Sequence, residues 1–128
     1  MTPSNTPKVL IIDDDSFIAE IIQASLEMNG NYLYRLCHSG SKALECLNDF
    51  PPDIVILDLL LEDMDGIDLL KEMSRLETMK SVPIVVLTGS DEPGIKRKAL
   101  EAGASSYVQK PFVPHKLVNL IQELLVSS

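Results

Sequence analysis

Polar residues stand at the points where the apolar runs of this chain end. They are Asp13-Asp14-Asp15 after Val-Leu-Ile-Ile, Asp58 after Ile-Val-Ile-Leu, Thr88 after Ile-Val-Val-Leu, and Lys110 after Tyr-Val-Gln. Ligands of open α/β sheets bind at the carboxyl ends of the strands. Carboxylates, a hydroxyl and an ammonium at one such edge indicate a site that binds a divalent cation and handles a phosphoryl group.

The acidic residues give the strongest signal. If the first and third strands are neighbours, Asp13, Asp14 and Asp58 lie within a few ångströms of one another. Two carboxylates ~4 Å apart repel by ~4 kcal/mol at an effective dielectric of about 20, and a bound hard cation such as Mg²⁺ offsets that repulsion. Capping of the next helix accounts for Asp15 or Ser16, but not for three consecutive acids.

Asp58 stands alone between apolar residues. It could be a strand-end carboxylate satisfied by backbone amides, but the functional interpretation is a nucleophile. A carboxylate can attack a phosphoryl donor and form an acyl phosphate. An ammonium and a hydroxyl at Lys110 and Thr88 can then bind phosphoryl oxygens. Each signal has a structural alternative, because a strand-end Thr is commonly structural and an edge-strand Lys is commonly solvated. Lys110-Pro111 is also a candidate cis peptide.

The elements that would position these residues alternate five times between strand and helix. Strands are predicted over 8–13, 32–37, 53–58, 83–88 and 105–109. Their continuous apolar character is typical of a parallel sheet covered by helices on both faces, a three-layer α/β sandwich. The first and third strands should be central. The last strand is the least apolar, which suits a sheet edge.

The intervening segments show the 3.6-residue period of amphipathic helices. The first is expected to stop at Gly30, the second to begin after Ser39–Ser41, the third to span 66–76, and the fourth to run from near Pro93 to Gly103. The fifth helix carries Leu117, Leu120, Ile121, Leu124 and Leu125. The aromatic residues Phe17, Phe50 and Phe112 are expected in the core.

Length and composition set further limits. With 128 residues, residues 8–127 are expected to form one domain after a disordered lead-in over 1–7. The net charge of −8 argues against direct binding of nucleic acid. No apolar run reaches the ~18 residues of a membrane span, and no signal peptide is evident. Cys37 and Cys46 lack metal-site spacing and are expected to be reduced, mostly buried thiols of a cytoplasmic protein.

Taken as an ordered set, the motifs resemble the receiver domains of two-component response regulators, including the single-domain chemotaxis regulators. The resemblance covers about residues 8–126. It is carried by Val-Leu-Ile-Ile-Asp13-Asp14-Asp15, Pro-Asp-Ile-Val-Ile-Leu-Asp58, Met64-Asp65-Gly66, Leu87-Thr88-Gly89, and the run from Ala102 to Phe112 that contains Tyr107 and Lys110-Pro111. It implies a flavodoxin-like (βα)5 fold with strand order 2-1-3-4-5.

The resemblance also implies roles. Asp58 would accept a phosphoryl group from a histidine kinase or phosphotransfer protein, with Mg²⁺ or Mn²⁺ as cofactor. The metal ligands would be Asp14, Asp58, Asp13 through water, and the backbone carbonyl of Leu60. Thr88 and Lys110 would bind the phosphoryl group, and Thr88 and Tyr107 would form the switch. Such a domain promotes its own phosphorylation and dephosphorylation without turning over an external substrate.

The resemblance further implies an output surface made by the fourth helix, fifth strand and fifth helix. This surface would contact a downstream effector or a second copy of the chain. Two positions depart from the family pattern. Glu62 replaces the usual Pro, and the apolar side chain of Leu60 cannot orient an attacking water. Ser90, two positions beyond Thr88, is small and only weakly able to orient that water. A comparatively long-lived acyl phosphate is therefore expected.

Three other functions remain alternatives. Asp13-x-Asp15 resembles the opening motif of haloacid-dehalogenase-type phosphatases, but that interpretation leaves Asp58 unexplained. An interaction module that is never phosphorylated would not need the full set of site residues. Flavin binding would need a phosphate loop where the three acids stand. A catalytic or ligand role is not expected for His38 or His115, and Lys96-Arg97-Lys98 is most simply a solvated helix face.

Overall fold

The computed structural model describes residues 6–127, in which strands and helices alternate along the chain. The strands are β1 (Lys8–Ile12), β2 (Leu33–Cys37), β3 (Ile54–Leu57), β4 (Ile84–Thr88) and β5 (Ser106–Gln109). The helices are α1 (Ser16–Met28), α2 (Gly40–Asp49), α3 (Gly66–Arg75), the short 3₁₀ helix η2 (Glu77–Met79), α4 (Ile95–Ala102) and α5 (Pro114–Ser127). The predicted α/β class is confirmed.

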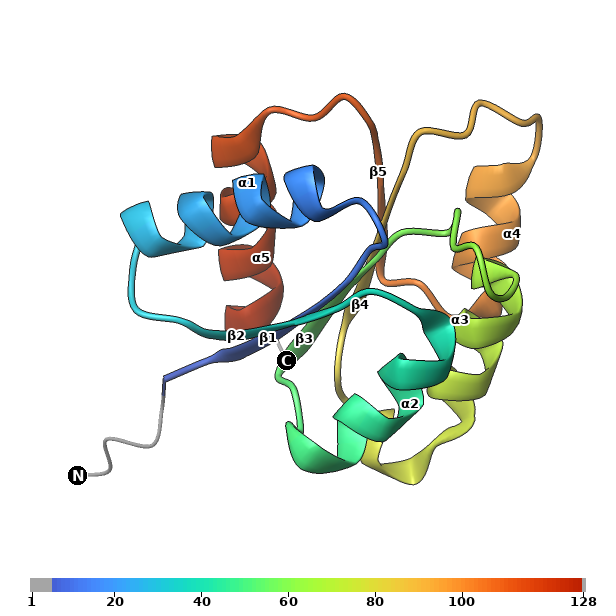
Figure 1. The fold of residues 1–128 in the computed structure, drawn as a ribbon, viewed down its shortest axis with the longest axis horizontal. Coiled ribbons are helices and arrows are strands. Elements are labelled where there is room, and N and C mark those ends of the chain that lie inside the picture. The colour runs from blue at the N-terminus through green and yellow to red at the C-terminus, as the bar shows by residue number, and fades with distance from the viewer. Residues whose placement is uncertain (1–5, 128) are drawn as a thin grey trace.

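The strands form one parallel sheet in the order β2-β1-β3-β4-β5. This order confirms the flavodoxin-like topology and places β1 and β3 side by side inside the sheet. Helices α1 and α5 cover one face, and α2, α3 and α4 cover the other (Figure 1). The half-buried polar strand β5 forms one edge, as predicted.

Alternate residues of the inner strands supply two separate core layers. In β1, Leu10 and Ile12 pack in the layer under α2, α3 and α4, whereas Val9 and Ile11 pack in the layer under α1 and α5. Successive side chains of a strand point to opposite faces, so a strand covered on both sides must be apolar throughout. This requirement explains why the first polar residue after each inner strand marks the carboxyl end of that strand.

One helix start differs clearly from the prediction. Helix α4 begins at Ile95 rather than near Pro93, because Gly94 adopts a left-handed conformation with φ of +82° and lies outside the helix. Helix α1 ends at Met28 with Asn29 as its C-cap, so Gly30 stops it as predicted, and α3 ends one residue before the predicted 76. Gly103 does end α4, with φ of +123°. The cis peptide expected at Lys110–Pro111 is present.

The prediction that Phe17 belongs to the core was wrong, since 69% of it is exposed. Phe50 and Phe112 do pack against the core. The buried residues of α1 recur at helical spacing and are Ala19, Ile22 and Leu26. Position 17 lies off that stripe, so the helix turns Phe17 toward solvent.

The predicted lead-in over residues 1–7 falls largely outside the described residues, which begin at Thr6. Pro7 is already attached to the sheet, because its carbonyl oxygen accepts a hydrogen bond of 2.9 Å from the Leu33 N–H. Over residues 6–127, no helix combines the length and apolar character needed to cross a membrane.

Candidate functional site

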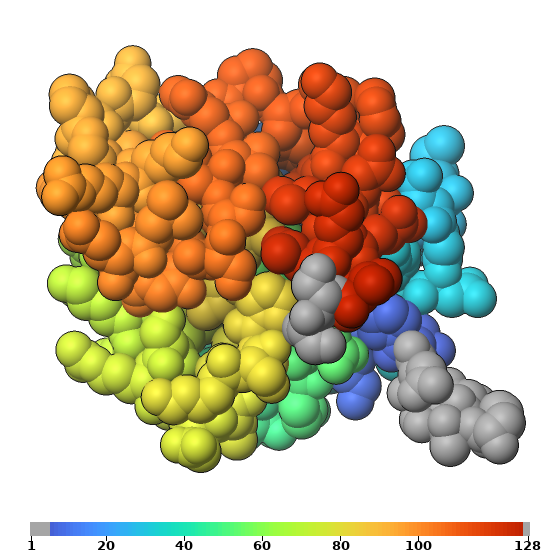
Figure 2. Space-filling model, turned by 180° about the vertical axis from the view of Figure 1, so that it is seen from behind, coloured from blue at the N-terminus to red at the C-terminus, as the bar shows by residue number. Residues whose placement is uncertain are grey.

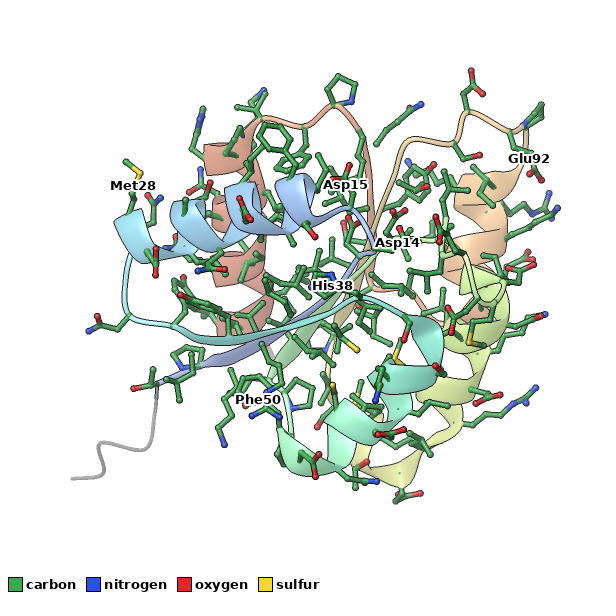
Figure 3. All side chains as sticks on the ribbon, in the orientation of Figure 1. Asp14, Asp15, Met28, His38, Phe50 and Glu92 are labelled. Atoms are coloured by element: carbon green, nitrogen blue, oxygen red, sulfur yellow. The ribbon has the colours of Figure 1, made fainter. Side chains whose placement is uncertain are left out.

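The carboxyl ends of four strands meet at one edge of the sheet and bring the predicted site residues together. Asp13 directly follows β1, Asp58 follows β3, Thr88 ends β4, and Lys110 follows β5. Figure 3 shows Asp14 at this edge, where β1 ends and the chain turns toward α1. The topology alone therefore gathers residues that lie far apart in the sequence.

The acidic cluster consists of Asp13, Asp14 and Asp58, whose ligand oxygen atoms all lie within 4.8 Å of one another. Asp13 and Asp58 are buried, and Asp14 is half-buried. The sheet itself holds this arrangement. The Asp13 N–H donates to the Cys37 carbonyl oxygen at 3.0 Å, and the Asp58 N–H donates to the Ile12 carbonyl oxygen at 2.9 Å.

Lys110 supplies positive charge to this cluster. Its Nζ lies 3.0 Å from Oδ2 of Asp13 and 3.2 Å from Oδ2 of Asp58, so it bridges two carboxylates on different strands. Burial alone would lower the pKa of Lys110, but its hydrogen bond to Asp13 and the charges of Asp13 and Asp58 outweigh burial and raise it. Burial raises the pKa of the Asp13 carboxyl.

The donor chemistry of the cluster fits a hard divalent cation. Three carboxyl groups face one ammonium, and carboxylate oxygen atoms are the ligands that Mg²⁺ takes in proteins. Half-buried Asp14 gives the cluster a side that opens to solvent. The Leu60 N–H donates to Oδ1 of Asp58 at 3.0 Å, which fixes the carboxylate and starts the loop that carries the predicted Leu60 ligand.

Asp15 does not belong to this cluster. Its Oδ1 accepts hydrogen bonds from the N–H groups of Phe17 and Ile18 at 3.0 and 3.4 Å, as the N-cap of α1. The capping role considered for this residue is confirmed. The second acid of the phosphatase-type motif therefore caps a helix and lies outside the acidic cluster.

Thr88 and Tyr107 are connected through one residue of the β4–α4 loop. Thr88 is fully buried, and its Oγ1 accepts a hydrogen bond of 3.3 Å from the Ser90 N–H. Half-buried Tyr107 donates its hydroxyl to the Ser90 carbonyl oxygen at 3.3 Å. The backbone of Ser90 thus lies between the hydroxyl of β4 and the aromatic ring of β5, a link that the sequence did not reveal.

The β3–α3 loop makes two contacts that the sequence analysis missed. The Glu62 N–H donates to Oδ2 of Asp14 at 3.0 Å. The Asp63 carboxylate accepts from the Gly40 and Ser41 N–H groups at 2.8 and 2.9 Å, and these hydrogen bonds lower the pKa of Asp63. The loop is therefore attached both to the acidic cluster and to the N-terminus of α2.

His38 and the basic run of α4 make contacts of their own. His38 is exposed, and its Nδ1 lies 3.2 Å from the carbonyl oxygen of Asp13, so it contacts the backbone of the site. The basic run of α4 is exposed, as expected. In it, Arg97 pairs with Glu101, and Lys98 pairs with Glu92, both at 3.2 Å.

Comparisons with known proteins agree with this geometry. The family model of the response regulator receiver domain matches residues 9–122. The chain is 34% identical over 118 residues to the response regulator MprA of Mycobacterium ulcerans. That alignment covers 92% of this chain and 50% of MprA, so the chain spans about half the length of this relative.

Solved structures show the same fold. A CheY-like response regulator receiver domain protein from Methanospirillum hungatei superposes with a TM-score of 0.88 at 27% identity, covering 96% of each chain. The chemotaxis response regulator CheY4 of Vibrio cholerae superposes with a TM-score of 0.85 at 27% identity, covering 94% of this chain and 99% of that one.

Proposed function

The chain belongs to the family of response regulator receiver domains, and we propose that its Asp58 accepts a phosphoryl group from the phosphohistidine of a histidine kinase or phosphotransfer protein. The family is one of two-component signalling domains with an acidic phosphorylation site, not of turnover enzymes. The family implies a histidine kinase as partner. In this proposal residues 8–127 form the receiver domain of a cytoplasmic protein.

One observation carries the proposal: the Lys110 ammonium bridges Asp13 and Asp58 at the edge where Asp14 completes the cluster. In transfer, an oxygen of Asp58 attacks the phosphorus atom as the phosphorus–nitrogen bond to the donor imidazole breaks. The electron pair of that bond remains on the imidazole nitrogen. Most catalysis of such a transfer is positioning and charge stabilisation, which fixed side chains can supply.

The residues of the chain divide this work. The Leu60 N–H holds Oδ1 of Asp58, while Lys110 holds Oδ2 and can follow the transferred group as a point charge. Asp13, Asp14, Asp58 and the Leu60 carbonyl would hold Mg²⁺ or Mn²⁺, which neutralises charge on the phosphoryl oxygens when it is bound. Among the three carboxylates, Asp14 is the one that solvent reaches most easily.

The same proposal assigns the switch to Thr88 and Tyr107. A phosphoryl group adds about −1.5 to −2 charges, and the Thr88 hydroxyl can donate a hydrogen bond to it. Since Ser90 N–H now donates to Thr88 and Ser90 carbonyl accepts from Tyr107, movement of Thr88 disturbs both contacts. The change would reach α4 and β5 through this loop.

The proposed output surface is the face formed by α4, β5 and α5. Figure 2 shows these segments, in orange and red, as a continuous surface. A downstream effector or a second copy of the chain would bind there. The net charge of −8 makes direct binding of nucleic acid by this domain unfavourable.

The proposal is tested by incubating the protein with Mg²⁺ and acetyl phosphate and measuring the intact mass. We expect a gain of one phosphoryl group in the wild type and in Asp91→Asn, a control at an exposed aspartate. We expect no gain in Asp58→Asn. A wild type that gains no phosphoryl group, or a gain that persists in Asp58→Asn, would contradict the proposal.

A further inference from the structure

The two cysteines of the chain are in contact, although they lie on different elements. Cys37 ends β2 and Cys46 lies in α2, and both are free thiols. The Cys46 thiol donates toward Sγ of Cys37 across 3.5 Å. The Cys37 thiol in turn donates to the Ser39 carbonyl oxygen at 3.5 Å. Neither thiol is required by the phosphoacceptor site.

The two thiols differ in their access to solvent. Cys37 is only 3% exposed, whereas Cys46 is partly exposed on α2. Burial, together with the hydrogen bond from Cys46, raises the pKa of Cys37 to about 12. Because Cys46 is the more exposed thiol, an oxidant from solvent reaches it first, and the Cys37 sulfur lies 3.5 Å away.

We propose that Cys37 and Cys46 form a modification site, a dithiol that a hydroperoxide oxidises to an intrachain disulfide joining β2 to α2. In the first step, Cys46 sulfur attacks the peroxide. The oxygen–oxygen bond breaks, Cys46 becomes a sulfenic acid, and the remaining oxygen leaves as water or alcohol. In the second step, Cys37 sulfur attacks Cys46 sulfur, and the sulfenic hydroxyl leaves with the Cys37 proton as water.

The geometry makes the second step a short movement. The sulfur atoms of a disulfide lie about 2.05 Å apart. The two Sγ atoms are now 3.5 Å apart, so they must approach by about 1.5 Å. Cys37 is fixed, because it pairs with Ile12 in the sheet register. Cys46 can move more freely, because the deeply buried residues that anchor α2 are Ala43 and Leu47. In this proposal the half-buried Cys46 makes the closing movement.

The bridge would lie next to the acidic cluster. The carbonyl oxygen of Cys37 accepts the hydrogen bond of the Asp13 N–H at 3.0 Å. The segment between the two cysteines begins with His38, whose Nδ1 lies 3.2 Å from the Asp13 carbonyl oxygen. A disulfide would therefore restrain the connection between β2 and α2 where it contacts the backbone of Asp13.

Treatment of the full chain with hydrogen peroxide, followed by denaturation and alkylation, tests the proposal. The wild type should become lighter by two hydrogen atoms, accept no alkyl group, remain monomeric without reductant, and yield one cross-linked peptide pair. The proposal would be overturned if Cys46 gained oxygen atoms while the Cys37 thiol remained free to react with the alkylating reagent. A disulfide between two chains would overturn it as well.

Variants test the order of the steps. In Cys37→Ala, Cys46 should stop at the sulfenic acid and be trapped by dimedone. In Cys46→Ser, Cys37 should stay unmodified at the same peroxide dose, and its rapid oxidation would contradict the order. Circular dichroism verifies that each variant is folded. Asp58→Asn retains both thiols and should oxidise as the wild type does, so the test is independent of the phosphoacceptor proposal.

Discussion

The backbone N–H of Glu62 donates a hydrogen bond of 3.0 Å to Oδ2 of Asp14. This contact ties the loop after the proposed phosphoacceptor to a proposed metal ligand. It also uses one lone pair of Asp14 Oδ2, so this donor competes with a cation that binds through the same oxygen. Proline at position 62 would have no N–H and could not make this contact.

We therefore expect Glu62→Pro to bind Mg²⁺ more tightly than the wild type. A net hydrogen-bond contribution of about 0.5–1.5 kcal/mol corresponds to roughly twofold to twelvefold in the dissociation constant. Isothermal titration calorimetry measures the difference. Glu62→Ala is the matched control, because it removes the side-chain charge but keeps the N–H. If both variants tighten binding equally, the hydrogen bond is not the cause.

Asp63 should make stability depend on pH in the acid range. Its pKa is lowered by the Gly40 and Ser41 N–H groups, so the folded state favours the charged carboxylate. The resulting stability is present above the unfolded pKa of about 3.9 and is lost as pH falls through the lower folded pKa. Asp63→Asn should be less stable than the wild type at pH about 7, with the difference disappearing in acid.

Urea unfolding at a series of pH values measures this difference. The control is Asp91→Asn, which also removes one negative charge, but at an exposed position in the β4–α4 loop. We expect that variant to follow the wild type. A stability difference for Asp63→Asn that stays constant down to pH about 2 would show that charge at Asp63 does not hold α2.

Gly66 should be irreplaceable at the start of α3. A Cβ atom there would meet the backbone of Leu59, including its carbonyl carbon at 2.7 Å, and backbone cannot rotate away as a side chain can. We expect Gly66→Ala to lower the free energy of unfolding by about 1–3 kcal/mol. At Gly89 a Cβ would find only Lys110 Cβ, at 3.9 Å.

Gly89→Ala is therefore the control for Gly66→Ala and should change the free energy of unfolding by less than about 0.5 kcal/mol. Urea denaturation of both variants gives the comparison. If both variants lower the free energy of unfolding equally, the replacement of glycine itself, rather than the contact with Leu59, determines the effect.

The sheet and the acidic cluster could be predicted because they depend on strand ends. The apolar runs identify buried strands, and the first polar residue after each run identifies the edge where Asp13, Asp58 and Lys110 meet. That inference needs only the periodicity of strands and the parallel order. It does not require knowledge of any loop conformation.

The contacts that escaped prediction depend on loops and helix packing. Glu62 and Asp14 are 48 positions apart, and their bond depends on the path of the β3–α3 loop. The thiols of Cys37 and Cys46 meet because α2 packs with one particular rotation against β2. Phe17 was misplaced because its helix buries a stripe that excludes it. The first two contacts have no signal in the order of residue types, whereas the helical stripe of α1 does indicate that Phe17 faces solvent.

Leu60 bears on how long a phosphoryl group would stay on Asp58. It is 59% exposed and lines the same hollow as Glu62 and Ser90, beside the carboxylate whose Oδ1 its N–H holds. An apolar side chain there cannot orient a water molecule toward phosphorus. If Asp58 is phosphorylated as proposed, the acyl phosphate should hydrolyse slowly.

Replacing Leu60 with Asn should accelerate the loss of the phosphoryl group. An amide that positions the attacking water by ~1.4 kcal/mol would speed hydrolysis on the order of tenfold. The measurement follows the first-order decay of phosphorylated protein by intact mass after the donor is removed. Leu60→Ala, which opens the same space without an amide, separates orientation of water from simple access. Equal decay rates for Leu60→Asn and Leu60→Ala would rule out orientation and leave access alone to set the lifetime.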